Sequence, residues 1–203
     1  MKSPILLAVA AASMSGGVIA SAQSTPTYTQ ADVRFMQGMI EHHGQALAMV
    51  ALIPSHTSRP DIRALGERIR VSQQDEIKLM KQWLTDRHQL ISMDMSHGGA
   101  SGHEMHMPGR AMSDTLMPGM LTTQQMTELA NASGAQFDVL FLKDMIQHHQ
   151  GALTMVAMLL GTTGSGQEPE VFRFAAEVDT DQRAEIARMG ALLATLQPGS
   201  TSR

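Results

Sequence analysis

A Met-x-x-His-His pattern occurs twice in this chain and brings thioether and imidazole side chains together. The two copies are Met39-x-x-His42-His43 and Met145-x-x-His148-His149. Thioether sulfur and imidazole nitrogen are ligands that suit copper, and the thioether favours Cu(I). A lone histidine on an apolar helix face is more often a hydrogen-bonded structural residue, but this pair recurs with its methionine at the same spacing. The pattern therefore predicts a copper site to which both copies contribute.

Four polar residues lie within the apolar stripes of two further predicted helices, at Gln73, Glu76, Gln182 and Glu185. A buried polar side chain needs a hydrogen-bond partner, and the histidines are the available ones. A carboxylate or amide that accepts a ring N–H would fix the tautomer of a ligating imidazole. The alternative is that these side chains turn to the rim of the protein.

A second group of soft ligands lies in the segment 89–121. Its members are Met93, Met95, His97, His103, Met105, His106 and Met107. The pairs Gly98-Gly99, Pro108-Gly109 and Pro118-Gly119 exclude a regular helix there, so these methionines have no helical core face to fill. Scattered thioethers suit a loosely held Cu(I) ion. A methionine-rich segment without a metal role is the alternative.

The elements that position the paired histidines belong to an internal repeat. Residues 32–51 resemble residues 138–157, and a weaker match relates 60–84 to 169–193. Apolar spacings of three and four residues predict a helix in each, with the first ending at Pro54 and the third covering 137–160. Two hairpins of this kind predict an all-α, antiparallel four-helix bundle.

Within that bundle, a helical wheel places Met39 and His43 on one apolar face, with His42 beside it. The third helix repeats this arrangement. We therefore expect Met39 and His43 to converge with Met145 and His149, although a modest rotation of the helix would exchange His42 for His43.

The composition indicates an exported protein. The first 22 residues have the short basic start, apolar run and small-x-small end of a signal peptide, with cleavage after Ala22 and a mature domain over 23–203. An uncleaved membrane anchor is the alternative, but polar residues and glycines interrupt the apolar run. The chain has no cysteine and 18 methionines, so a soft-metal site must use thioether and imidazole. A net charge of −4 without a basic stripe argues against nucleic acid as a partner.

The doubled motif Asp-x-x-Phe-x-x-x-Met-Ile-x-His-His-x-x-Ala, followed each time by Gln-x-x-Glu-Ile-x-x-Met, resembles the domain-of-unknown-function-305 family. The resemblance covers residues 29–196. It implies a ferritin-like four-helix bundle, usually exported, and some relatives are periplasmic copper-binding proteins. The residues that match the family motif are the six of the two Met-x-x-His-His copies, whereas the cluster at 93–107 rests on ligand chemistry alone.

The expected function is binding without catalysis: a periplasmic or secreted protein that sequesters copper or hands it to a copper-handling partner. Cu(I) is favoured as the bound ion, and Cu(II) is possible. One rival is a metal-free helical interaction module with structural histidines. The other is a di-iron oxidoreductase, which needs a Glu-x-x-His motif that this chain lacks. Oligomeric state stays open.

Overall fold

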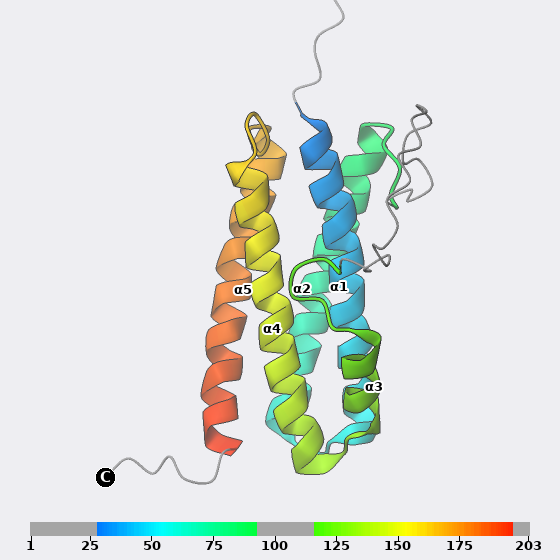
Figure 1. Ribbon diagram of the computed structural model, residues 1–203, viewed down its shortest axis with the longest axis vertical. Coiled ribbons are helices and arrows are strands. Elements are labelled where there is room, and N and C mark those ends of the chain that lie inside the picture. The colour runs from blue at the N-terminus through cyan, green and yellow to red at the C-terminus, as the bar shows by residue number, and fades with distance from the viewer. Residues whose placement is uncertain (1–27, 93–115, 197–203) are drawn as a thin grey trace, which may run out of the picture.

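The computed structural model describes residues 28–92 and 116–196, and this part of the chain forms five helices and no strand (Figure 1). They are α1 (Gln30–His56), α2 (Pro60–Asp86), α3 (Thr123–Asn131), α4 (Gly134–Gly161) and α5 (Pro169–Leu196). The all-α class and the four long helices expected from the repeat are confirmed. The short helix α3 was not expected.

Local sequence explains where the helices begin. Thr29 caps α1 in a reciprocal capping box with Asp32, and Thr122 caps α3 in the same way with Gln125. Both α2 and α5 start at a proline, which has no amide hydrogen to leave unpaired in the first turn.

The predicted end of the first helix at Pro54 is wrong, because α1 continues to His56 with Pro54 inside its last turn. The amide of Thr57 still donates to Ile53 O, so the turn closes around the proline. A proline this close to the end of a helix removes only one hydrogen bond of the final turn.

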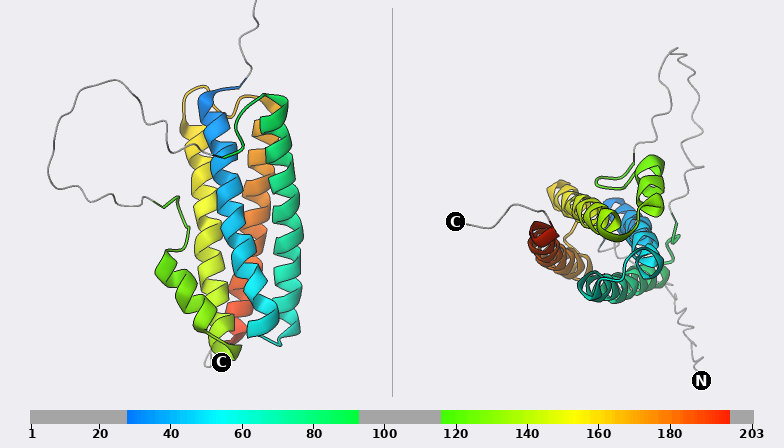
Figure 2. Two further views of the ribbon diagram at one scale, coloured as in Figure 1. Left: turned by 90° about the vertical axis from the view of Figure 1, so that its right-hand side faces the viewer. Right: turned by 90° about the horizontal axis from the view of Figure 1, so that it is seen from below.

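The four long helices are antiparallel to their neighbours. Helix α1 packs on α2, α4 packs on α5, and α1 joins the two hairpins by packing on α4 (Figure 2). Because α1 and α4 are equivalent in the repeat and run in opposite directions, an approximate two-fold axis crosses their interface. Helix α3 lies on the outside of α1 and α4, where it breaks this symmetry.

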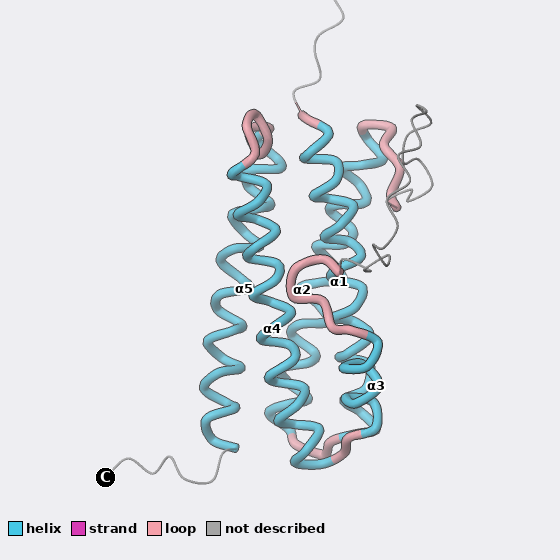
Figure 3. Tube along the Cα trace, in the orientation of Figure 1, coloured by secondary structure: helices cyan, strands magenta, loops and turns pink. Residues whose placement is uncertain are grey.

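Residues 116–122, called the strap here, cross the middle of the α1–α4 face before α3 begins (Figure 3). Gly151 of α4 makes this close approach possible, since a Cβ at that position would lie 2.0 Å from Pro118 O. Gln45, the equivalent residue of α1, instead holds the strap with its side chain. It donates to Leu121 O over 3.0 Å and accepts from Leu121 N over 2.7 Å.

The buried apolar side chains form two separate clusters along the bundle. The upper cluster includes Met36, Met39, Trp83, Met155 and Phe174, and the lower cluster includes Met49, Ile69, Phe137, Phe141 and Met145. No helix within the described ranges is long and apolar enough to cross a membrane. The gap between the clusters lies at the level of the paired histidines.

Candidate metal centre

Four histidines occupy the level between the two apolar clusters, and all four are fully buried. They are His42, His43, His148 and His149. The sequence left open whether His42 or His43 points inward, and the fold buries both. Together with the buried side chains of Gln73, Gln182 and Glu185 and the partly exposed side chain of Glu76, on α2 and α5, they form what we call the polar layer.

The two rings that meet across the α1–α4 interface are those of His42 and His148. Their centroids lie 3.8 Å apart, with the ring planes inclined by 37°. Equivalent residues meet in this way where a two-fold axis passes between them. The expected convergence of His43 with His149 is therefore wrong, because α1 is rotated so that His43 faces α2 and His149 of α4 faces α5.

Each of the other two histidines contacts a carboxylate of its own hairpin. His43 Nε2 lies 2.5 Å from Glu76 Oε2, and His149 Nε2 lies 2.5 Å from Glu185 Oε2. Ser72 donates a further hydrogen bond of 2.9 Å to Glu76 Oε1. The expected pairing of buried glutamates with histidines is thus present in both halves.

The two glutamines of the layer do not take the same role as the two glutamates. Both nitrogen and oxygen of the Gln73 side chain lack a hydrogen-bond partner, as does Gln182 Oε1. These residues lie one turn before the glutamates on the same helices.

The contacts of three histidines determine which nitrogen keeps its lone pair. A carbonyl can only accept, so His42 Nε2 donates to Pro118 O over 3.0 Å. The carboxylates place the proton on Nε2 of His43 and His149 in the same way. In the neutral form of each of these three rings, Nδ1 is then the nitrogen with the lone pair, and it is buried without a partner. Neither nitrogen of His148 makes a hydrogen bond.

Burial keeps the central pair of histidines neutral. The pKa of His42 is lowered to about 3, chiefly by burial and then by the neighbouring His43. The pKa of His148 is lowered still further, again by burial first and then by His42. Neutral imidazole is the form that coordinates a metal, so these rings are ready to bind at ordinary pH.

The methionines of the repeated motif do not come together. Met39 and Met145 are both fully buried, but Met39 belongs to the upper cluster and Met145 to the lower one. Each lies one turn from the histidines of its own helix, on opposite sides of the polar layer. The second predicted ligand group, from Met93 to Met107, lies outside the described residues.

In the part of the chain that the structure describes, no three His, Asp or Glu side chains are arranged to hold one metal ion. The unpaired atoms of the polar layer are imidazole nitrogens and amide atoms of Gln73 and Gln182. The imidazole nitrogens, together with thioethers, suit a copper ion.

Two residues near the polar layer had no signal in the sequence analysis. Pro118 acts through its backbone carbonyl, which every residue type has, so its role cannot be seen in the sequence. Gly119 and Gly151 lie where the strap approaches α4 closely. Asp181 is the counterpart of Ser72 in the repeat, and burial and the nearby Glu76 and Glu185 raise its pKa. The α2–α5 side of the layer is thus rich in carboxylates.

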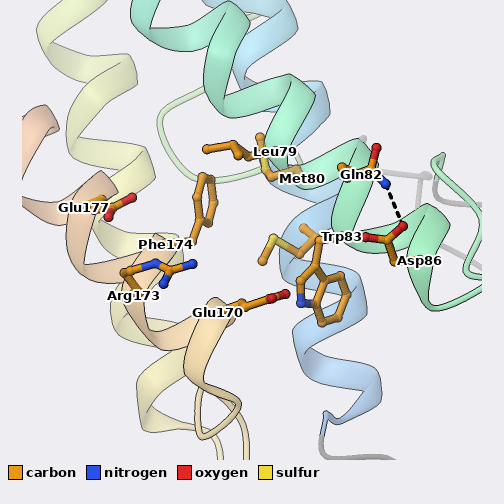
Figure 4. Close-up of a pocket in the computed structure, with 10 residues that line it drawn as sticks. Leu79, Met80, Gln82, Trp83, Asp86, Glu170, Arg173, Phe174 and Glu177 are labelled. Carbon is orange, nitrogen blue, oxygen red and sulfur yellow. Dashed lines mark hydrogen bonds between the residues drawn. The ribbon is translucent and has the colours of Figure 1, made fainter.

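A cavity of about 200 Å³ opens further along the seam between α2 and α5 (Figure 4). Trp83 and Phe174 line it, together with several charged side chains at its rim. Two of the carboxylates are already engaged, since Asp86 accepts from Gln82 and Glu170 accepts from Arg87.

Solved structures with the same fold include proteins seen with copper. CopM in its Cu(I)-bound form is 25% identical, with a TM-score of 0.58 over 81% of this chain and 96% of that one. The Cu(II)-bound form of CopM gives 25% identity and a TM-score of 0.56, with 81% and 97% covered.

Further relatives match over nearly their whole length. A DUF305 fragment from Deinococcus radiodurans is 29% identical, with a TM-score of 0.67 over 84% of this chain and 99% of that one. A DUF305 protein from Streptomyces coelicolor, described as secreted, is 27% identical, with a TM-score of 0.66 and 85% and 98% covered.

A shorter match links the chain to uncharacterized protein L153 of Acanthamoeba polyphaga mimivirus, at 39% identity over 56 residues. It spans 28% of this chain and 37% of that relative. The family described as Domain of unknown function (DUF305) matches residues 32–193, which include both His-His helices and both glutamate helices. With this match and these neighbours, the chain belongs to the DUF305 family.

Proposed function

We propose that this is an exported copper-binding protein that sequesters copper or hands it to another protein. The observation that carries the proposal is the set of buried imidazole nitrogens without hydrogen-bond partners in the polar layer. A buried polar group left unpaired costs about 1–3 kcal/mol, which a bound ion would offset. The Cu(I)- and Cu(II)-bound structures of CopM support copper as the ion.

The chemistry of the donors favours Cu(I). Neutral imidazole and thioether are soft ligands that carry no charge, and they suit a monovalent ion better than a hard divalent one. His42 and His148 would supply nitrogen ligands, with Met39 and Met145 one turn away on either side. Glu76 and Glu185 would hold the rings of His43 and His149 in the tautomer that presents Nδ1.

Binding rather than catalysis fits the enclosure of these nitrogens. All four imidazoles are fully buried, and the strap lies over His42, so no open cleft presents these rings to an organic substrate. The thioethers and imidazoles of residues 93–107 would capture copper first and pass it to the polar layer. Export is supported by the signal-like first 22 residues and by the relative described as secreted.

The substitution His148→Leu tests the polar layer. Because His148 makes no hydrogen bond, leucine leaves no partner unpaired, and the fold should be kept or slightly stabilised. We expect the variant to lose about one equivalent of Cu(I), with an affinity for that ion at least about tenfold lower. Chelator competition and elemental analysis measure both quantities.

His88→Gln is the matched control, since His88 is exposed and lies outside the layer. It should bind copper like the natural protein. Deleting residues 93–115 should lower the copper count further by removing the second ligand group. Unchanged copper binding in His148→Leu would favour the alternative, a metal-free helical module in which the histidines only complete the core.

A further inference from the structure

A second pocket beside the polar layer is lined by methionines from two elements. It has a volume of about 350 Å³ and lies between α1, α4 and the strap. Met117 of the strap and Met155 and Met158 of α4 line it, together with Phe35 and Arg34 of α1. No carboxylate lines this pocket, and its uncharged side-chain donor atoms are the three thioether sulfurs and the hydroxyl of Thr162, which donates to Met158 O.

The three methionines differ in exposure. Met158 is 60% exposed, whereas Met155, one turn earlier on the same face of α4, is 9% exposed. Met117 is half-buried on the strap. Met158 at the mouth, Met155 in the wall and Met117 on the strap thus place three thioethers between solvent and the interior of the pocket. Three rotatable bonds let each side chain move its sulfur toward a common ion.

The strap is held in place, so the position of Met117 is defined by more than its own packing. The next residue, Pro118, accepts a hydrogen bond from His42, and Leu121 is held by the side-chain amide of Gln45. Gly151 gives the strap its close approach to α4. Pro118 also lines the pocket, so the pocket and the polar layer share a wall.

We propose that Met117, Met155 and Met158 form an entry site for a soft monovalent ion, Cu(I) or Ag(I), from which the ion passes under the strap to His42 and His148. The choice of copper as cargo rests on the proposed function. Thioethers are neutral and do not titrate, so they bind soft ions without a competing proton. Arg34 at the same pocket repels a divalent ion about twice as strongly as a monovalent one, which adds selectivity.

The test follows Ag(I) binding to the metal-free, full-length protein labelled with ¹³C at the methionine methyl groups. We expect the resonances of Met117, Met155 and Met158 to shift together as Ag(I) is added to saturation. Met126 of α3 lies outside the pocket and should not move with them. If the three resonances stay at their metal-free positions, the entry site does not exist.

The double substitution Met117→Leu and Met158→Leu removes two sulfurs at nearly constant volume. We expect it to abolish the shift of the Met155 resonance and to lower the affinity for the Ag(I) ion in this pocket at least about tenfold. The control Met126→Leu should bind Ag(I) as the natural protein does. If the three methionines only pack against one another or against an apolar ligand, their replacement by leucine leaves Ag(I) binding unchanged. That result would refute the proposal.

The two proposals fail in different ways. Loss of Cu(I) binding in His148→Leu without Ag(I)-induced shifts at the three methionines would reject the entry site and leave the polar layer as the copper site. Methionine shifts combined with normal copper binding by His148→Leu would keep the entry site and reject the polar layer.

Discussion

At the residue scale, the histidines of each His-His pair have different tasks. His42 and His148 face each other on the approximate two-fold axis, while His43 and His149 are each held by a glutamate. Both pairs have an unpaired, buried Nδ1, and the first pair has strongly lowered pKa values. A pattern of adjacent identical residues thus produces two kinds of site, because neighbours on a helix point about 100° apart.

The lowered pKa values of His42 and His148 predict that the metal-free protein loses stability in mild acid. Below the unfolded-state pKa of about 6.5, the unfolded chain binds protons that the folded chain does not, so stability falls as pH drops toward the folded value of about 3 for His42. The loss should be roughly 2 kcal/mol for each histidine between pH 7 and pH 5. Urea denaturation at several pH values measures it.

The variant His148→Leu isolates this effect from the other titrating groups. Asp144, for instance, has a pKa raised to about 6, chiefly by burial and then by Glu128, and its contribution to stability changes with pH in the opposite direction. The difference in stability between the natural protein and the variant should grow by roughly 2 kcal/mol from pH 7 to pH 5. A pH-independent difference would show that His148 has the same pKa in the folded and the unfolded protein.

At the scale of elements, the strap distinguishes the two halves of the repeat. Where α1 has Gln45, whose amide binds Leu121, α4 has Gly151, over which the strap passes. The chain between the hairpins thereby covers the polar layer on the α1–α4 side. Access to His42 from this side requires the strap to move.

Substituting Gly151→Ala should displace the strap, because the new Cβ would lie 2.0 Å from Pro118 O and 2.5 Å from Gly119 Cα. Backbone atoms cannot turn away as a side chain can, so we expect a loss of about 1–3 kcal/mol. The Leu121 amide should exchange its hydrogen faster as its bond to Gln45 loosens.

The matched control for the strap is Gly44→Ala on α1, where an added Cβ meets nothing within 4 Å. It should stabilise the protein by up to about 1 kcal/mol, as alanine does in a helix. Hydrogen exchange and thermal unfolding compare the two variants. Equal effects would mean that the strap is not seated against α4.

At the scale of the whole molecule, the polar layer divides one bundle into two apolar clusters. Such a layer costs stability unless its groups are paired, and here several are not. The repeat places the same residues on both sides of the axis, so each half contributes a glutamate and two histidines.

The symmetry predicts that Glu76→Gln and Glu185→Gln each weaken copper affinity, by about 10- to 100-fold, because each releases one histidine from its tautomer. The double variant should be weaker than either single one. Glu67→Gln is the control, since Glu67 pairs with Arg70 on the exposed surface. Chelator competition measures the affinities. If Glu76→Gln, Glu185→Gln and the control Glu67→Gln bind copper equally tightly, the glutamates have a purely structural role.

Much of this arrangement could be predicted from the sequence. Apolar periodicity indicated the four long helices, and the repeat predicted their pairing into equivalent hairpins. The contacts of Glu76 and Glu185 with histidines followed from the cost of burying a lone carboxylate. Helix α3 was missed because it is only nine residues long and buries a single leucine, Leu129.

The sequence by itself determined the helices, the duplication and the residue types that gather at the middle of the bundle, because these depend on local periodicity and on the cost of burying polar groups. Only the tertiary structure decided that His42 and His148 meet while His43 and His149 turn to the glutamates. That choice depends on the rotation of α1 and α4 about their axes, which the packing of all four helices sets together. It also decided that a backbone carbonyl, Pro118 O, completes the surroundings of His42.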